Sequence, residues 1–107
     1  MEESLDFHPS SVHATLTVST TVVDFSDAST TPIVDKMVKV VFQVDPAGGN
    51  ARMTKDGATD PVGATTGIRL DAGDIVELTR TEAINAKFIR DASADATLQI
   101  QGCGTKV

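Results

Sequence analysis

The sequence predicts an all-β protein, an antiparallel β-sandwich or barrel of about seven to eight short strands. Three observations support this prediction. Val and Thr are abundant while Leu is sparse, and side chains branched at Cβ favour the pleated surface of a sheet. Several short segments alternate apolar and polar residues, which is the period of a strand. Turn-forming Gly, Pro, Asp and Asn separate those segments, and no long helical pattern interrupts them.

The first half of the predicted domain contains the pattern of a half-buried strand and the pattern of a central strand. Apolar and polar side chains alternate over 13–19, so a half-buried strand is expected there, continued or restarted over 21–25. The segment 26–32 is rich in Asp, Ser, Thr and ends in Pro, which predicts a loop. The segment 37–45 has one fully apolar face and a second face that is partly apolar. It is the strongest strand signal in the chain and predicts a central strand.

The middle of the chain predicts a short strand, a projecting loop and a sharp turn. The strand 51–55 has two plausible inward faces, one with Ala51, Met53 and Lys55 and one with Arg52 and Thr54. The loop 56–66 is too long for a tight hairpin and has no apolar period, so we expect it to project and to offer a contact surface.

Two further strands, 67–70 and 74–80, flank Asp71-Ala72-Gly73, where the glycine suits a left-handed turn position. This pattern indicates either a compact hairpin or a corner between two sheets. The segment 81–86 can form one helical turn with Thr81 as its cap. Strands are then expected over 86–90, with Phe88 inward, and over 95–102.

One domain is expected from a chain of 107 residues, with 13–107 as the β-sandwich and 1–12 as an N-terminal arm. The arm is polar and acidic but contains Leu5 and Phe7. It is either ordered against a neighbouring subunit or simply a frayed terminus. The chain has four Phe and no Trp or Tyr, so aliphatic side chains must fill most of the core. A domain with so few large rings gains stability from partners.

The composition also bears on partners and compartment. The formal net charge of −6 argues against nucleic-acid binding, because Lys and Arg are scattered singly. No apolar run approaches the ~20 residues of a membrane helix. The N-terminus lacks the basic and apolar regions of a secretory signal, so synthesis as a soluble intracellular product is expected. The single Cys103 predicts no internal disulfide; a small buried residue is the favoured interpretation, with an intermolecular bridge or a metal ligand as alternatives.

No catalytic, cofactor or metal site is expected. His8 and His13 lie five residues apart around a turn, which is not a zinc spacing. Neighbouring serines lack the strained turn and orienting acid of a hydrolase nucleophile. The pair Gly48-Gly49 lacks the following Lys of a phosphate loop. A set of aspartates departs from the spacing of a calcium loop and is interpreted as turn-forming and solubilising: Asp56, Asp60, Asp71 and Asp74.

About half of the chain resembles a pattern found in small virion proteins of tailed bacteriophages. In that pattern a strand ends in T-x-D-G-T-x-P, a G-x-x-L-x-A-G-D turn follows, and the chain closes with F-x-x-I-R/K and D-A-T-L-x-V/I. The matching residues here are Thr54, Asp56-Gly57, Thr59, Pro61, Gly67, Leu70, Ala72-Gly73-Asp74, Phe88-Ile89-Arg90 and Asp95-Ala96-Thr97-Leu98. The chain departs from the pattern by an extra residue in the loop 56–66, by the closer FIR spacing and by its arm.

The resemblance implies a β-sandwich without a cofactor that acts by binding other virion subunits. The expected role is that of a capsid decoration, or cement, protein that stabilises the assembled head. Its expected partners are the major capsid protein and further copies of itself, with a trimer as the expected oligomer. A neck or tail adaptor and a receptor- or glycan-binding tail module remain alternatives, although the lack of Trp and Tyr disfavours sugar stacking. The expected contact residues are Leu5, Phe7, Asp60, Pro61 and Val62.

Overall fold

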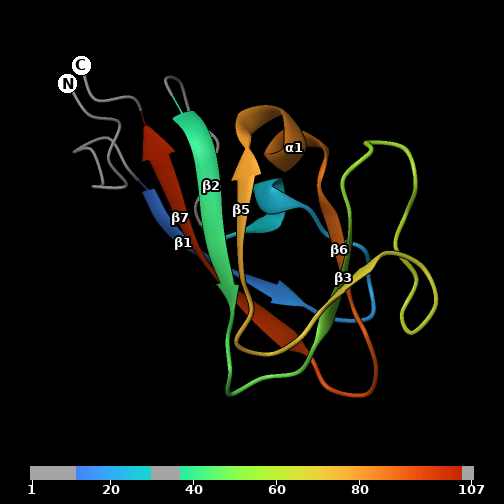
Figure 1. Ribbon diagram of the computed structural model, residues 1–107. Helices are drawn as coiled ribbons and strands as arrows, with labels where there is room; N and C mark the ends of the chain where they lie inside the picture. The colour runs from blue at the N-terminus through green and yellow to red at the C-terminus, as the bar shows by residue number, and fades with distance from the viewer. Residues whose placement is uncertain (1–11, 30–36, 105–107) are drawn as a thin grey trace.

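The computed structural model describes residues 12–29 and 37–104. In this part of the chain, seven strands form two antiparallel sheets, accompanied by one 3-10 turn and one short helix. Figure 1 shows the two sheets on either side of a common core. The prediction of an all-β sandwich is therefore confirmed. The predicted N-terminal arm, with Leu5 and Phe7, lies outside the described residues.

The larger sheet, sheet A, has four strands in the order β1-β7-β2-β5. They are β1 (Val12–Val18), β7 (Ala96–Gly104), β2 (Met37–Val44) and β5 (Ile75–Thr79). Strand β2 lies between β7 and β5, which confirms that the strongest strand pattern forms a central strand. Alternation along these strands turns one set of apolar side chains toward the other sheet: Ala14, Leu16, Val18, Val40, Phe42, Val44, Leu78, Ala96, Leu98 and Ile100.

The smaller sheet, sheet B, has three strands in the order β4-β3-β6. They are β4 (Ile68–Leu70), β3 (Ala51–Thr54) and β6 (Lys87–Arg90). Ala51 and Met53 are buried while Arg52 and Thr54 are only partly covered, so these two residues of the first predicted face point inward. Lys55, the third residue of that set, follows the strand and is exposed.

The turn between β4 and β5 is a corner between the sheets, because β4 belongs to sheet B and β5 to sheet A. Asp71 N–H donates to the Asp74 carboxylate at 2.8 Å, and Asp74 N–H donates back to the Asp71 carbonyl at 2.9 Å. Gly73 has a φ of 97°, which a residue with a Cβ adopts only under strain. Of the two alternatives that the sequence left open, the structure thus has the corner and not the hairpin.

The expected strand over 21–25 is absent. Val23 instead makes a single bridge with Phe88, and a 3-10 turn, η1 (Phe25–Asp27), follows. The Asp24 carboxylate accepts from Ser26 N–H at 2.9 Å, and Asp27 accepts from Asp24 N–H at 3.0 Å. This reciprocal cap satisfies the backbone locally and ends the extended conformation.

The expected helical turn exists as α1 (Arg80–Asn85), but its cap is Thr79 and not Thr81. The Thr79 hydroxyl accepts from Glu82 N–H at 3.2 Å, and the Glu82 carboxylate accepts from Thr79 N–H at 2.9 Å. The Thr79 N–H and the Lys55 ammonium hold the pKa of Glu82 below its usual range. The last residue of β5 therefore also starts the helix.

Three phenylalanines join the two sheets at the centre of the core. Phe42 lies on β2, Phe88 on β6 and Phe25 on η1, and each is at most 1% exposed. Their ring centroids are 5.1 to 5.9 Å apart in edge-to-face arrangements. Such pairs are favourable because the positive ring edge meets the negative face. The prediction that Phe88 points inward is confirmed.

Candidate interaction surface

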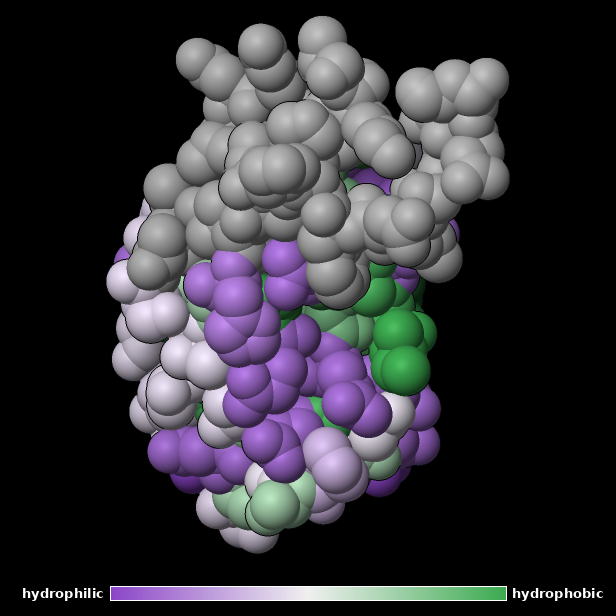
Figure 2. Space-filling model, turned by 90° about the vertical axis from the view of Figure 1, so that its left-hand side faces the viewer, coloured by the Kyte–Doolittle hydropathy of each residue, from purple (hydrophilic) through white to green (hydrophobic). Residues whose placement is uncertain are grey.

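The outer face of sheet A is open among the described residues. A shallow hollow of about 300 Å³ lies on it. Figure 2 shows this side of the molecule, with hydrophilic residues down the centre and hydrophobic residues at the right. The hollow is lined by polar residues of β1, β2 and β7 and by apolar residues of β2, β5 and β7: His13, Gln43, Gln99 and Gln101, with Val41, Phe42, Ile75 and Ile100.

The loop 56–66 lies at the other side of the molecule, between β3 and β4 (Figure 1). The Asp56 carboxylate accepts from Ala58 N–H at 3.0 Å, from Thr59 N–H at 2.8 Å and from the Thr59 hydroxyl at 2.7 Å. The bonds from the Thr59 hydroxyl and from these N–H groups hold the pKa of Asp56 at about 2. The Thr54 hydroxyl also donates to the Thr59 carbonyl at 2.6 Å. The first half of the loop is therefore closed by its own hydrogen bonds.

The second half of the loop forms a small turn that packs on the end of β6. Val62 N–H donates to the Thr66 carbonyl at 3.0 Å, and Thr66 N–H donates back at 2.9 Å. Gly63 lies so near β6 that a Cβ there would be 2.9 Å from the Arg90 carbonyl. Glycine is required at this position because of that close approach of two backbones.

The structure separates the three loop residues that were expected to contact a partner. Asp60 is exposed and pairs with the Lys87 ammonium at 2.9 Å, and Val62 is 51% exposed. Pro61 between them is buried, so its ring packs within the domain and is not offered to a partner. Asp60 and Val62 remain predicted contacts. Leu5 and Phe7 lie outside the described residues.

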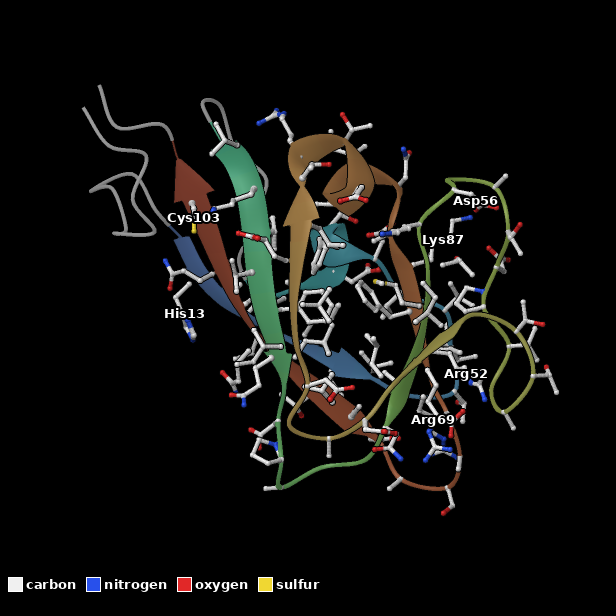
Figure 3. All side chains as sticks on the ribbon, in the orientation of Figure 1. His13, Arg52, Asp56, Arg69, Lys87 and Cys103 are labelled. Carbon is white, nitrogen blue, oxygen red and sulfur yellow. The ribbon has the colours of Figure 1, made fainter. Side chains whose placement is uncertain are left out.

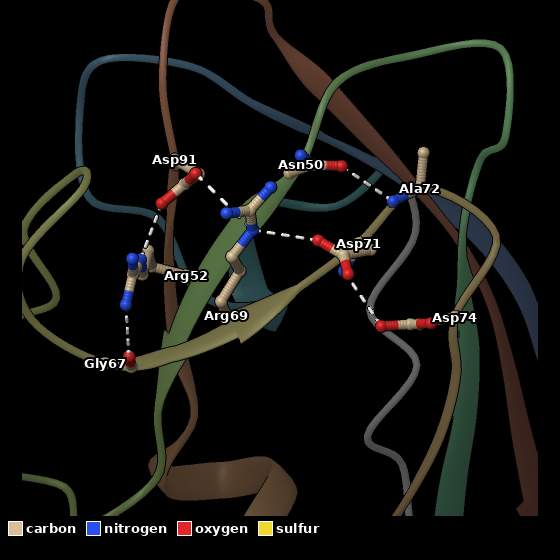
Figure 4. Close-up of polar contacts among 8 residues, drawn as sticks. All are labelled: Asn50, Arg52, Gly67, Arg69, Asp71, Ala72, Asp74 and Asp91. Atoms are coloured by element: carbon tan, nitrogen blue, oxygen red, sulfur yellow. Dashed lines mark hydrogen bonds and ion pairs between the residues drawn. The ribbon is translucent and has the colours of Figure 1, made fainter.

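A charged network joins strands β3 and β4 to the segment that follows β6 (Figure 4). Its centre is Asp91, which is 7% exposed. Arg52 donates from Nε to Asp91 at 2.6 Å and from a terminal nitrogen to the Gly67 carbonyl at 3.0 Å. Arg69, which lies opposite Arg52 in the sheet, has its Nε 2.8 Å from the Asp71 carboxylate and 3.7 Å from that of Asp91.

This network explains how two arginines can face each other across neighbouring strands. Like charges opposite each other destabilise a sheet, and the Asp91 carboxylate between them offsets that repulsion. The hydrogen bond from Arg52 and the charges of Arg52 and Arg69 hold the pKa of Asp91 below its usual range, against the effect of burial. This group could not be predicted from the sequence, because its members come from three separate segments.

A second hollow, of about 280 Å³, lies beside the network, between the loop and the chain that follows β6. Its walls include Thr20, Gly63, Ile89 and Asp91. The Asp91 carboxylate is already paired with Arg52, so the charge in this hollow is balanced by the protein itself. The hollow has no arrangement of nucleophile, base and orienting acid that would indicate catalysis among these residues.

The remaining candidates from the sequence occupy separate places. His13 lies on β1, far from Asp56 and Lys87 (Figure 3). Among the described residues, no three His, Cys, Asp or Glu side chains are grouped as metal ligands would be. Gly48 and Gly49 belong to the turn after β2, where Gly49 N–H donates to the Asp95 carbonyl at 2.9 Å.

Cys103 is buried near the end of β7, as the sequence favoured. Burial raises the pKa of its thiol above the usual range, and the Lys39 ammonium opposes that effect in part. A buried thiol of raised pKa is a poor nucleophile, because the reactive form is the thiolate.

Comparison with models of protein families gives no match, and searches of curated proteins and of solved structures give none either. Over the ranges 12–29 and 37–104, no helix has the length and apolar character needed to cross a membrane.

Proposed function

We propose that this protein is a structural component of a tailed-phage virion, where it decorates the assembled capsid as a cement protein. The observation that carries the proposal is that the residues matching the phage pattern are those that shape the loop and the corner. Gly57, Gly67 and Gly73 have positive φ values of 77°, 113° and 97°. Pro61 and Leu70 are buried. The resemblance therefore lies at positions that constrain the backbone, which supports a β-sandwich geometry shared with the proteins that carry the pattern.

The proposed mechanism is mass action. A protein that binds assembled shell but not free subunits stabilises the shell by its binding free energy, repeated at every site. The partner in this proposal is the major capsid protein, and the protein itself acts as a homo-oligomer. The loop 56–66 suits such a contact because Asp56 and the Asp60–Lys87 pair already order it, so little entropy is lost on binding.

The decisive experiment measures copy number per virion and the heat-induced release of genome from shells with and without the protein. A cement protein is expected in many copies, and shells that lack it should release their genome at a lower temperature. A few copies per virion, or unchanged heat release, would refute the proposal. Images of labelled virions separate the alternatives: signal at one vertex indicates a neck or tail adaptor, and signal over the whole head indicates decoration.

A loop variant tests where the contact lies. Val62→Asp places a charge in the proposed interface, so we expect lower occupancy on purified shells. Ile84→Asp on α1 is the matched control, because Ile84 is 56% exposed and Val62 is 51% exposed. Equal occupancy for the two variants would remove the loop from the interface. Binding of the protein to a glycan array, which we do not expect, would instead favour a receptor-binding tail module.

A further inference from the structure

Strand β5 forms an unpaired edge of sheet A. It stands at the end of the order β1-β7-β2-β5, so within residues 12–29 and 37–104 it has a neighbouring strand on one side only. Val44 N–H donates to the Asp74 carbonyl at 2.9 Å, and the pairs Phe42–Val76 and Val40–Leu78 continue that register. Successive residues of an antiparallel strand direct their backbone groups to opposite sides. The even-numbered residues of β5 therefore bond to β2, and the odd-numbered residues direct theirs outward.

The outward residues of β5 are Ile75, Glu77 and Thr79. The Thr79 N–H is already bonded to the Glu82 carboxylate. The N–H and C=O groups of Ile75 and Glu77 have no backbone partner on that side among the described residues. Ile75 is also the most exposed large apolar side chain of the described residues, at 70%.

The opposite edge of the sheet differs. On β1, Thr15 directs its backbone groups outward, and Ser29 occupies both: Thr15 N–H donates to the Ser29 hydroxyl at 3.0 Å, and Ser29 N–H donates to the Thr15 carbonyl at 2.8 Å. Natural sheets protect their edges with Lys, Pro, bulges or such covering segments. The β5 sequence, IVELT, contains neither Lys nor Pro. Among the described residues, the backbone groups of Ile75 and Glu77 on this edge are therefore open to pairing.

We propose that β5 pairs antiparallel with β5 of a second copy of this chain, about a twofold axis at Val76. The pairing joins two copies of sheet A into one continuous sheet. An isologous contact of this kind closes at two subunits. It concerns the isolated chain and does not depend on the proposed role in a virion. A trimer, expected from the resemblance, would need a different interface.

The free backbone groups select one register. If Ile75 lay opposite Ile75 of the second copy, Glu77 would lie opposite Gly73 of that copy, whose N–H is bonded to the Val44 carbonyl at 2.7 Å. If Glu77 lay opposite Glu77 of the second copy, the two carboxylates would lie side by side. Thr79, whose N–H already donates to the Glu82 carboxylate, would then lie opposite Ile75 of that copy. With Ile75 opposite Glu77 of the second copy, all the free groups are used. Each copy then contributes two residues with one donor and one acceptor each, which makes four hydrogen bonds.

The side chains fit this register. On the outer face, Ile75 packs beside the aliphatic part of Glu77 of the second copy and lies diagonal to Ile75 of that copy, within reach for long side chains. On the inner face, the two partly buried Val76 side chains meet at the axis. Glu77 keeps its ion pair with Lys39, at 2.7 Å, so repulsion between the two carboxylates is reduced. The contact covers the apolar part of the outer face that Ile75 and Val41 line.

The first test removes the outward donor. Sedimentation velocity of the full chain, from about 1 to about 100 µM, should show a monomer–dimer equilibrium. Glu77→Pro removes the N–H that points outward and spares the bonds to β2, so this variant should stay monomeric with an unchanged circular dichroism spectrum. Glu77→Gln removes the charge and keeps the N–H, and it should still dimerise. A monomeric wild-type chain, or a dimer that persists in Glu77→Pro, would overturn the proposal.

The second test addresses the register and does not use proline. Ile75→Asp would place an acid opposite Glu77 of the second copy at both symmetry-related positions, so the dimer dissociation constant should rise by about tenfold or more. Ile75→Lys would place a base there and should leave dimerisation at least as strong. Equal effects of the two variants would show that Ile75 does not face Glu77, and the proposed pairing would be wrong.

Discussion

Truncation of Phe88 to alanine should remove a large share of the stability of this domain. Phe88 is fully buried, and its ring lies 5.1 Å from Phe25 and 5.5 Å from Phe42. A buried Phe→Ala change costs about 3–5 kcal/mol through lost burial and the cavity left behind. The total free energy of unfolding of a domain of this size is about 5–15 kcal/mol. Phe88→Ala therefore removes a large fraction of the free energy of unfolding, because the core has few aromatic rings.

The assay is urea unfolding followed by circular dichroism, together with thermal unfolding. At about 4–8 °C per kcal/mol, we expect the Tm to fall by more than about 12 °C. Ile84→Ala is the control, because Ile84 is 56% exposed and its truncation leaves no internal cavity. A double-mutant cycle with Phe25→Ala should also show coupling of about 0.5–1.5 kcal/mol. A loss below about 1 kcal/mol for Phe88→Ala would refute the central role assigned to the three rings.

Three further predictions concern polar and backbone features. Asp91 has a folded-state pKa below its unfolded value of about 3.9, so the stability it contributes is present above that pH and is lost as pH falls through the folded pKa. Asp91→Asn should therefore lower the urea midpoint of unfolding at neutral pH. The midpoint of the variant should then fall less than that of the wild type between about pH 5 and about pH 2, and an equal fall in both proteins would contradict this. Thr79→Ala should cost about 1 kcal/mol by urea unfolding, and Thr81→Ala much less, because Thr79 is the cap; the reverse order would place the cap at Thr81. Gly57→Ala should lower the Tm, because φ there is 77° and the added Cβ would meet an Asn85 oxygen at 2.8 Å; an unchanged Tm would mean that the loop rearranges freely.

The strands were predictable where one face is buried and the other is not. Alternation is strict over 13–18, and Ala14, Leu16 and Val18 are all buried. The two-residue period is a direct consequence of strand geometry, so it can be recognised in the sequence even when the neighbouring strands are unknown.

The elements whose predicted positions were wrong are those where a side chain forms hydrogen bonds with backbone groups that would otherwise pair in a sheet. The segment 21–25 has the residue types of a strand, but Asp24 caps a turn and sends Phe25 into the core. Thr79 and Thr81 both suit a helix cap, and the choice depends on where β5 stops pairing with β2. Propensity alone does not contain that information.

The loop 56–66 was predicted only in outline. Composition placed a loop at 56–66, and the structure has one there. Its inward and outward residues depend on packing against β6, which buries Pro61 and leaves Val62 exposed. The Asp91 network carried no sequence signal, because residues distant along the chain meet only in the folded sheet.

The sequence by itself determined the class of fold, the central place of β2 and the left-handed turn position of Gly73. These follow from local physics: the period of a strand, the branching of Val and Thr, and the φ angles that a Cβ forbids. The tertiary structure alone decided that β4 and β5 belong to different sheets, that Asp91 lies between Arg52 and Arg69, and that β5, among the described residues, has a neighbouring strand on one side only. Those features depend on which strands meet, and strand pairing is a contact between distant segments that local pattern does not encode.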